Sequence, residues 1–114
     1  MSDCIFCHIV ARTIPATLVY EDDLVVAFDD INPQAPTHTL VIPRKHVTSI
    51  VELEDLDVGL LGRLMLAGNK ISKLKGIADS GYRFVINTGA NGGQTVSHLH
   101  LHVLGGRHMA WPPG

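Results

Sequence analysis

The chain has 114 residues, of which 46% are hydrophobic and 18% are charged, and its formal net charge is -2 at pH 7. This length suits one domain with a single core, and the composition excludes an intrinsically disordered chain. The weakly acidic balance argues against a nucleic-acid polymer as partner, whereas a free nucleotide remains compatible, since local dipoles can hold a small anion.

The N-terminal segment MSDCIFCHIV has neither the basic nor the long apolar region of a signal peptide. No run of about 18 apolar residues is available to span a membrane. Cys4 and Cys7 are the only cysteines, and they lie too close together for a fold-wide disulfide framework. The sequence therefore predicts a cytoplasmic protein with no membrane association.

Residues 4–11 are predicted to form one or two helical turns, which Pro15 prevents from continuing. In TLVYEDDLVVAFDDI, β-branched and aromatic residues predict strands over 17–20 and 24–29, separated by an acidic turn. THTLVIP, residues 37–43, alternates well enough for a third strand that ends at its proline.

The period changes over residues 53–75, where apolar residues recur every three or four positions, as on one face of a helix: Leu53, Leu56, Leu60, Leu64, Ala67, Ile71 and Leu74. Asp55 is the expected N-cap and Gly76 the expected end. Gly59, Gly62 and Gly68 would each cost about 1 kcal/mol relative to alanine. Packing must therefore hold this helix, with close backbone approach at the glycines.

A fourth strand is predicted over residues 82–87, a glycine-rich loop over 88–94, and a fifth strand over 96–104. Strands outnumber helices, and most connections are too short for parallel crossovers. The sequence therefore predicts an α+β domain in which an antiparallel sheet carries one main helix on one face.

Three histidines alternate with apolar residues in SHLHLHVLGG, residues 97–106. Successive side chains of a strand point to opposite faces. The three histidines, His98, His100 and His102, would therefore share one face at a spacing of about 7 Å. The apolar residues between and after them, Leu99, Leu101 and Val103, would face the core. One ring can then act as a nucleophile, an acid or base, or a metal ligand. A polar sheet face is the alternative, but three histidines beside a glycine-rich loop favour a functional site.

His38, His46 and the loop NTGANGGQTV join this candidate site. An adjacent third strand would bring His38 against the same face, whereas His46, in PRKH, is either a neighbour or part of a solvated turn. The loop lacks the ending of a P-loop, yet its glycines let backbone N–H groups approach an anion. A plain hairpin connection is the alternative, because Asn-Gly is a common turn pair.

The stretch GGQTVSHLHLHVLGGRHMAWPPG resembles the histidine-triad (HIT) superfamily, and in particular its nucleotide-binding Hint branch. AFDDINPQAPTHTLVIPRKH and CIFCHIVARTIPATLVYEDD resemble the same branch, so the resemblance covers nearly the whole chain. It implies a single HIT domain over residues 1–114, with a five-stranded antiparallel sheet, one main helix and a short N-terminal helix. It also implies a homodimer with a continuous sheet, in which the tail, about residues 105–114, reaches towards the partner subunit.

The resemblance further implies hydrolysis of purine nucleoside 5′-phosphoramidates, of AMP or GMP type, through a nucleotidyl-histidine. His100 matches the nucleophile, His38 and His102 match its flanking histidines, and His98 matches the first member of the triad. The matching nucleotide contacts are Asp30, Ile31, Asn87, Gly93, Gln94, Thr95, His100 and His102. Asp30 would bind the ribose hydroxyls, although a plain turn residue is the alternative.

Two positions depart from the pattern of the branch: Thr95 replaces a common serine, and Ser97 stands where an aromatic residue is frequent. The chemistry would need no cofactor. Cys4-x-x-Cys7 is either half of a zinc site or a pair of buried thiols on a short helix. The resemblance supplies His46 and His98 as the two further ligands of a structural zinc. A dinucleoside polyphosphate hydrolase and a nucleotide- or zinc-binding regulatory module without turnover are the alternative functions.

Overall fold

The structure, a computed structural model, describes residues 3–114 and contains two α-helices and one five-stranded sheet. The elements are α1 (Ile5–Val10), β1 (Leu18–Glu21), β2 (Val25–Asp29), β3 (Thr37–Pro43), α2 (Val58–Leu74), β4 (Tyr82–Val85) and β5 (Leu101–Gly105). The strand order is β1-β2-β3-β5-β4, and every neighbouring pair is antiparallel. The predicted α+β class, with one main helix and a short N-terminal helix, is confirmed.

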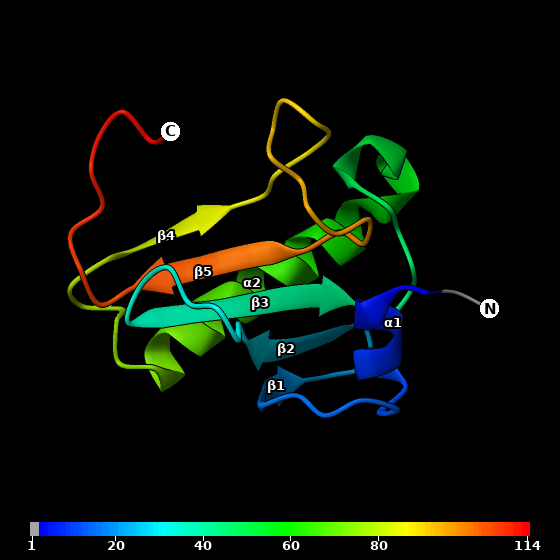
Figure 1. The fold of residues 1–114 in the computed structure, drawn as a ribbon, viewed down its shortest axis with the longest axis horizontal. Helices are drawn as coiled ribbons and strands as arrows, with labels where there is room; N and C mark the ends of the chain where they lie inside the picture. Colours follow the sequence, from blue (N-terminus) through cyan, green and yellow to red (C-terminus); the bar gives the residue numbers. More distant parts are fainter. Residues whose placement is uncertain (1–2) are drawn as a thin grey trace.

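Two apolar clusters cover the two faces of the sheet. Val25 and Ala27 of β2 pack in the cluster that contains α2, while Val26 and Phe28 pack with Phe6 of α1. Alternate side chains of one strand thus enter different cores, which is why β2 is apolar at consecutive positions. Figure 1 shows α2 crossing behind the sheet and α1 in front of it, beside the end of β3. None of the described helices has the length and apolar character that a membrane span requires.

Helix α2 begins at Val58, later than the predicted residue 53. Two short 3-10 turns precede it, Ile50–Glu52 and Asp55–Asp57. The carboxylate of Asp57 accepts a hydrogen bond from the backbone N–H of Glu54 at 2.9 Å, and this bond closes the second turn before the helix starts. Asp55 is therefore not the N-cap of α2, and Leu56, at 98% exposure, does not belong to the buried stripe. The predicted end is correct, since Gly76 has a φ of +73° directly after the C-cap.

One of the three glycines in α2 makes the expected close approach. A Cβ atom at Gly68 would lie 2.6 Å from Cζ of Phe84 on β4 and 3.2 Å from Cδ2 of Leu101 on β5. Gly59 and Gly62 face open space instead. The absence of a side chain at Gly68 therefore brings the helix against the sheet, while the other two glycines have no packing role.

Strands β4 and β5 are shorter than predicted, and residues 96–100 run outside the sheet ladder. The backbone N–H of Leu99 donates to the carbonyl of Val47 at 2.6 Å, so this part of the chain bonds the segment after β3 rather than continuing β5. The alternation of faces nevertheless holds. Leu99 and Leu101 lie in the α2 core, while the rings of His98 and His100 contact Phe6 on the opposite side.

Candidate functional site

A cleft of about 540 Å³ lies on the α1 side of the sheet. It is lined by His38, His100 and His102, and by most of the residues predicted to contact a nucleotide: Asp30, Ile31, Asn87, Gly93 and Thr95. Much of the remaining lining is apolar, from α1, the segment that follows it, β2 and β3: Ile5, Phe6, Ile9, Ile14, Pro15, Ala16, Phe28 and Leu40. The cleft therefore has one polar, imidazole-rich part and one apolar part. The side chains of His98 and Gln94 are not in its lining.

The backbone before β5 determines which nitrogen of His100 carries the proton. Nδ1 of His100 lies 2.7 Å from the carbonyl oxygen of His98. A carbonyl only accepts, so Nδ1–H donates, and in the neutral ring Nε2 keeps its lone pair. The Phe6 ring packs nearly perpendicular to the imidazole, with the two ring centroids 5.3 Å apart, and so helps to orient it. His100, buried to 5% exposure, thus holds an oriented imidazole at the wall of the cleft.

Gln34, His38 and His102 form a hydrogen-bond relay with defined direction. The backbone N–H of Gln34 donates to Nδ1 of His38 at 3.0 Å, so the neutral His38 ring carries its proton on Nε2. That Nε2 lies 2.9 Å from Nδ1 of His102 and donates to it. The proton of His102 is therefore on Nε2. Among the described residues, this Nε2 is the buried side-chain nitrogen or oxygen without a hydrogen-bond partner.

Burial keeps the relay histidines neutral. Desolvation is the main cause that lowers the pKa of His102 to about 4, and the neighbouring His100 and His38 lower it further. Burial also lowers the pKa of His38, partly offset by Asp30, whose Oδ2 lies 3.5 Å from Nε2 of His38. At neutral pH the Nε2–H of His102 is thus an uncharged donor beside His100, whose ring centroid is 4.9 Å away.

Asp30 serves as a turn residue and also lines the cleft. Its Oδ1 accepts from the backbone N–H of Asn32 at 2.8 Å, which is an Asx turn. The next residue, Ile31, is 98% exposed although it lines the cleft. The two interpretations from the sequence are therefore compatible, because a carboxylate held by its own backbone can still accept hydrogen bonds from a ligand.

The side chain of Gln94 holds the glycine-rich loop together. Its amide accepts from the N–H of Gly89 at 3.0 Å and donates to the carbonyl oxygens of Thr48, at 2.7 Å, and Val96, at 2.9 Å. Gly93, with a φ of +77°, adopts a conformation that disfavours a side chain. The side chain of Gln94 thus stabilises the loop through hydrogen bonds, while Gly93 lines the cleft.

The side chains of Cys4, Cys7, His46 and His98 form a second cluster, next to the first turn of α1. Nδ1 of His98 lies 3.3 Å from Sγ of Cys4 and 3.6 Å from Sγ of Cys7. Nδ1 of His46 lies 3.1 Å from Sγ of Cys7 and 3.2 Å from Nδ1 of His98. Ligand atoms around a tetrahedral Zn²⁺ are separated by about 3.3–3.8 Å, given bonds of about 2.0–2.3 Å. The cluster has the donor types and close to the dimensions of such a site.

The proton of His98 is placed to suit this cluster. Its Nε2 lies 2.9 Å from the carbonyl oxygen of Pro43 and donates to it, which leaves the lone pair of Nδ1 directed at the thiols. His98 is fully buried, and this burial lowers its pKa. The structure therefore separates His98 from its neighbours, because its side chain joins the cysteines while its carbonyl orients His100.

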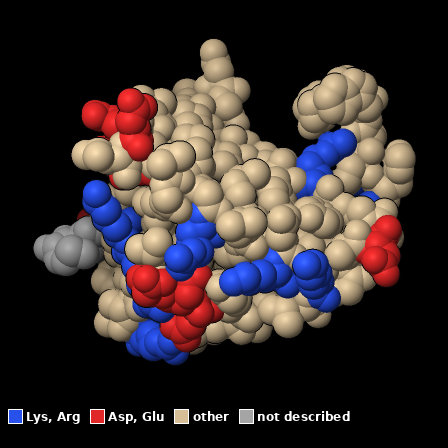
Figure 2. All heavy atoms as spheres, turned by 180° about the vertical axis from the view of Figure 1, so that it is seen from behind, with Lys and Arg blue, Asp and Glu red and all other residues tan. Residues whose placement is uncertain are grey.

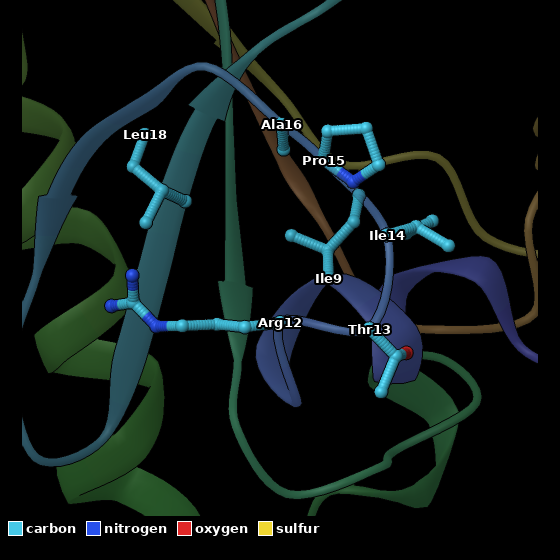
Figure 3. Close-up of a pocket in the computed structure, with 7 residues that line it drawn as sticks. All are labelled: Ile9, Arg12, Thr13, Ile14, Pro15, Ala16 and Leu18. Atoms are coloured by element: carbon cyan, nitrogen blue, oxygen red, sulfur yellow. The ribbon is translucent and has the colours of Figure 1, made fainter.

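A second hollow, of about 360 Å³, lies between α1 and β1 (Figure 3). It shares Ile9, Ile14, Pro15 and Ala16 with the cleft, so these residues form a wall common to both. Its one cation, Arg12, is paired with Glu21. None of the residues predicted for the functional site lines this hollow.

Comparison with known proteins places these features in a family. The HIT domain model matches residues 11–109. The chain is 54% identical over 112 residues to an uncharacterized HIT-like protein of Synechococcus elongatus, covering 98% of this chain and 97% of that protein. It is 49% identical over 115 residues to the 14 kDa zinc-binding protein of Zea mays, covering 99% of this chain and 89% of that protein.

Solved structures agree with this assignment. A HIT family hydrolase from Legionella pneumophila superimposes with a TM-score of 0.96 at 49% identity, over 98% of this chain and all of the other. A histidine triad protein from Clostridium difficile superimposes with a TM-score of 0.93 at 45% identity, over 96% of both chains. These matches, together with the histidines gathered in one cleft, show that the chain belongs to the HIT, or histidine-triad, family.

Proposed function

We propose that the protein is a hydrolase of purine nucleoside 5′-phosphoramidates, as in the Hint branch of the family. The main support for this proposal is that two histidines with opposite tautomers lie side by side in the cleft. His100 presents an Nε2 lone pair, and His102 beside it presents an Nε2–H that has no partner among the described residues. A lone pair for phosphorus and a donor for its oxygen are the two groups that nucleotidyl transfer needs. The hydrolase named from Legionella pneumophila supports the reaction class.

The reaction proceeds in two displacements. The Nε2 lone pair of His100 forms a bond to the α-phosphorus while the P–N bond breaks, and its electron pair stays on the amine, which takes a proton from water. The Nε2–H of His102 donates to a non-bridging oxygen, where charge accumulates. Water then cleaves the bond between phosphorus and His100, which releases the nucleoside monophosphate and restores the imidazole.

The rest of the cleft suits a purine nucleoside. The apolar lining around Phe6, Ile9 and Phe28 offers a surface for a planar base. The carboxylate of Asp30 can accept two hydrogen bonds from a ribose diol, and Gly93 and Thr95 line the phosphate side. The function is tested with a fluorogenic adenosine 5′-phosphoramidate, for which equimolar release of AMP and amine is expected. Binding of AMP without turnover would favour a regulatory module, and faster cleavage of a competing dinucleoside polyphosphate would favour the other hydrolase.

We also propose that the protein is a homodimer whose sheets join edge to edge, with the C-terminal tail near the partner's cleft. β4 lies at an edge of the sheet, and the exposed side of α2 carries apolar residues such as Met65 and Leu66. Sedimentation equilibrium is expected to give about twice the chain mass of 12.3 kDa. A monomer mass at micromolar concentration would contradict this proposal.

A second proposal is a structural zinc ion at Cys4, Cys7, His46 and His98, supported by their separations and by the zinc-binding relative from maize. A bound zinc would supply a crosslink between α1 and the segments carrying the two histidines. Metal analysis is expected to find one zinc per chain in the wild type and little in Cys7→Ser, with a lower melting temperature. His8→Ala, on the same helix but outside the cluster, should retain the metal. Zinc retained in Cys7→Ser, or a metal-free wild type of unchanged stability, would contradict the proposal.

A further inference from the structure

The loop between β4 and β5, residues 88–95, is closed by its own hydrogen bonds. The N–H of Gly89 donates to the side-chain oxygen of Gln94 at 3.0 Å, and the carbonyl oxygen of Gly89 accepts from the backbone N–H of Gln94 at 3.1 Å. A Cβ atom at Gly92 would collide with the backbone of Thr88, so the two sides of the loop are in contact. These contacts define the shape of the loop, but they do not place it over the cleft.

A single hydrogen bond connects this loop to a remote part of the chain. Within residues 3–114, the bond from Nε2 of Gln94 to the carbonyl oxygen of Thr48, at 2.7 Å, is the one that joins residues 88–95 to a segment beyond residue 96 or before residue 87. Figure 1 shows the loop beside the segment between β3 and α2. Residues 89–93 are exposed, so burial does not hold them. Because Gly93 and Thr95 flank Gln94 and line the cleft, the bond to Thr48 determines where both of them lie.

The carboxylate of Glu52 holds Thr48 in turn. Oε1 of Glu52 accepts from the backbone N–H and from the hydroxyl of Thr48, each at 2.5 Å. Both residues are exposed, so these bonds rather than packing fix the conformation of Thr48. Val47, in contrast, is buried in the α2 core, and its carbonyl oxygen accepts from the N–H of Leu99. Thr48 is therefore an exposed link between the core and the loop, and Glu52 restrains that link.

The acidic residues of the two 3-10 turns do not pair with Lys or Arg. Figure 2 shows acidic side chains gathered at the end of the molecule that carries these turns. Among the ion pairs of residues 3–114, none includes Glu52, Glu54, Asp55 or Asp57. A charged acceptor makes stronger hydrogen bonds than a neutral one. The carboxylate of Glu52 is thus available to Thr48 as a charged acceptor rather than as the partner of a cation.

We infer that Glu52 is a positioning residue for the phosphate of a bound nucleotide and acts through Thr48 and Gln94 on the loop. This inference rests on the proposed function, in which Gly93 and Thr95 lie on the phosphate side of the cleft. Glu52 is not in the lining of the cleft. Without its carboxylate, the carbonyl of Thr48 is free to turn away from Gln94, and the loop loses its anchor. The base and ribose keep their contacts, because these lie on the α1 and β2 side of the cleft.

The test compares the binding of AMP and of adenosine, which differ only in the phosphate, by calorimetric titration. Glu52→Ala is expected to raise the dissociation constant of AMP about fivefold, the loss expected for one hydrogen-bonded anchor, and to leave that of adenosine unchanged. Glu52→Gln keeps an acceptor oxygen at the same place and should retain most of the affinity for AMP. Asp55→Ala, the matched control, removes an exposed carboxylate from the neighbouring turn and should bind both ligands as the wild type does.

A double substitution tests the route through Gln94. Gln94→Ala alone should weaken AMP binding at least as much as Glu52→Ala, because it removes the hydrogen bond to Thr48 directly. Adding Glu52→Ala to Gln94→Ala should then change the dissociation constant of AMP little, since Thr48 no longer anchors the loop. If the two effects multiply in full, Glu52 acts by another route, and the inference is overturned.

Adenosine separates this inference from the function on which it rests. If Glu52→Ala binds AMP and adenosine as the wild type does, the proposed function stands and the positioning role is overturned. The role is also overturned if Glu52→Ala weakens both ligands equally, or if Asp55→Ala weakens AMP as much, because Glu52 then contributes only to general stability or local charge. If the wild type binds neither ligand, the proposed function fails, and the positioning role fails with it.

Discussion

Replacing His100 with alanine is expected to lower kcat/KM for an adenosine 5′-phosphoramidate at least about a thousandfold, because the substitution removes the atom that we propose bonds to phosphorus. No other histidine in the cleft can replace it. The Nδ1 atoms of His38 and His102 accept hydrogen bonds from Gln34 and His38, so their lone pairs are engaged. The measurement is steady-state release of AMP and amine by the purified variant.

The binding of AMP should survive in the same variant, because Asp30, the apolar lining and the loop around Gly93 remain. Calorimetric titration is expected to give a dissociation constant within a few-fold of the wild type. His8→Ala, at a position on α1 outside the cleft, provides the matched control and should retain full activity. Undiminished turnover by His100→Ala would overturn the assignment of the nucleophile, and with it the two-displacement mechanism.

The substitution Gly68→Leu is expected to lower the free energy of unfolding by about 3 kcal/mol, since overpacking at a helix–sheet contact forces both elements apart. Its first added atom would already lie 2.6 Å from the ring of Phe84 and 3.2 Å from Leu101. Urea unfolding followed by circular dichroism measures the change, at one fixed protein concentration because the protein is proposed to be a dimer.

Gly62→Ala is the matched comparison in the same helix. Nothing lies within 4 Å of a Cβ atom at Gly62, so the substitution should stabilise the protein by about 0.5–1 kcal/mol through helix propensity alone. Opposite signs for the two variants are the expected result. A Gly68→Leu variant as stable as the wild type would show that the helix does not depend on close approach to β4.

Periodicity in the sequence was sufficient to predict the class of fold and the order of its elements. The alternation in THTLVIP and in SHLHLHV correctly separates the two faces of the sheet, because each face is covered by its own apolar cluster. The start of α2 was not predictable from its apolar stripe, since Asp57 and Glu54 close a 3-10 turn through a polar contact that leaves Leu56 exposed.

The site was predictable in its residue types but not in its hydrogen bonds. Spacing in SHLHLH treats the three histidines as equivalent, whereas carbonyl oxygens of Pro43 and His98 give His98 and His100 opposite tautomers. These acceptors are backbone atoms and leave no signal in the sequence. The role of Gln34 was missed for the same reason, although its position four residues before His38 in QAPTH was visible. The bonds of Gln94 within the loop were not predictable either, because they depend on the folded position of Thr48. The contact of Gln94 with a nucleotide stays a prediction.

Among the described residues, the Nε2–H of His102 has no hydrogen-bond partner, and this affects how tightly the proposed site would hold a nucleoside monophosphate. An unsatisfied buried donor costs the ligand-free protein about 1–3 kcal/mol, and an incoming phosphoryl oxygen recovers that cost. Because His102 and His38 are neutral, the recovery depends on a dipole rather than a full positive charge. A dipole stabilises the charge that builds up on phosphorus without retaining a finished monophosphate as strongly as a buried cation would. For the proposed reaction, we therefore expect the site to stabilise the transition state more than the bound product.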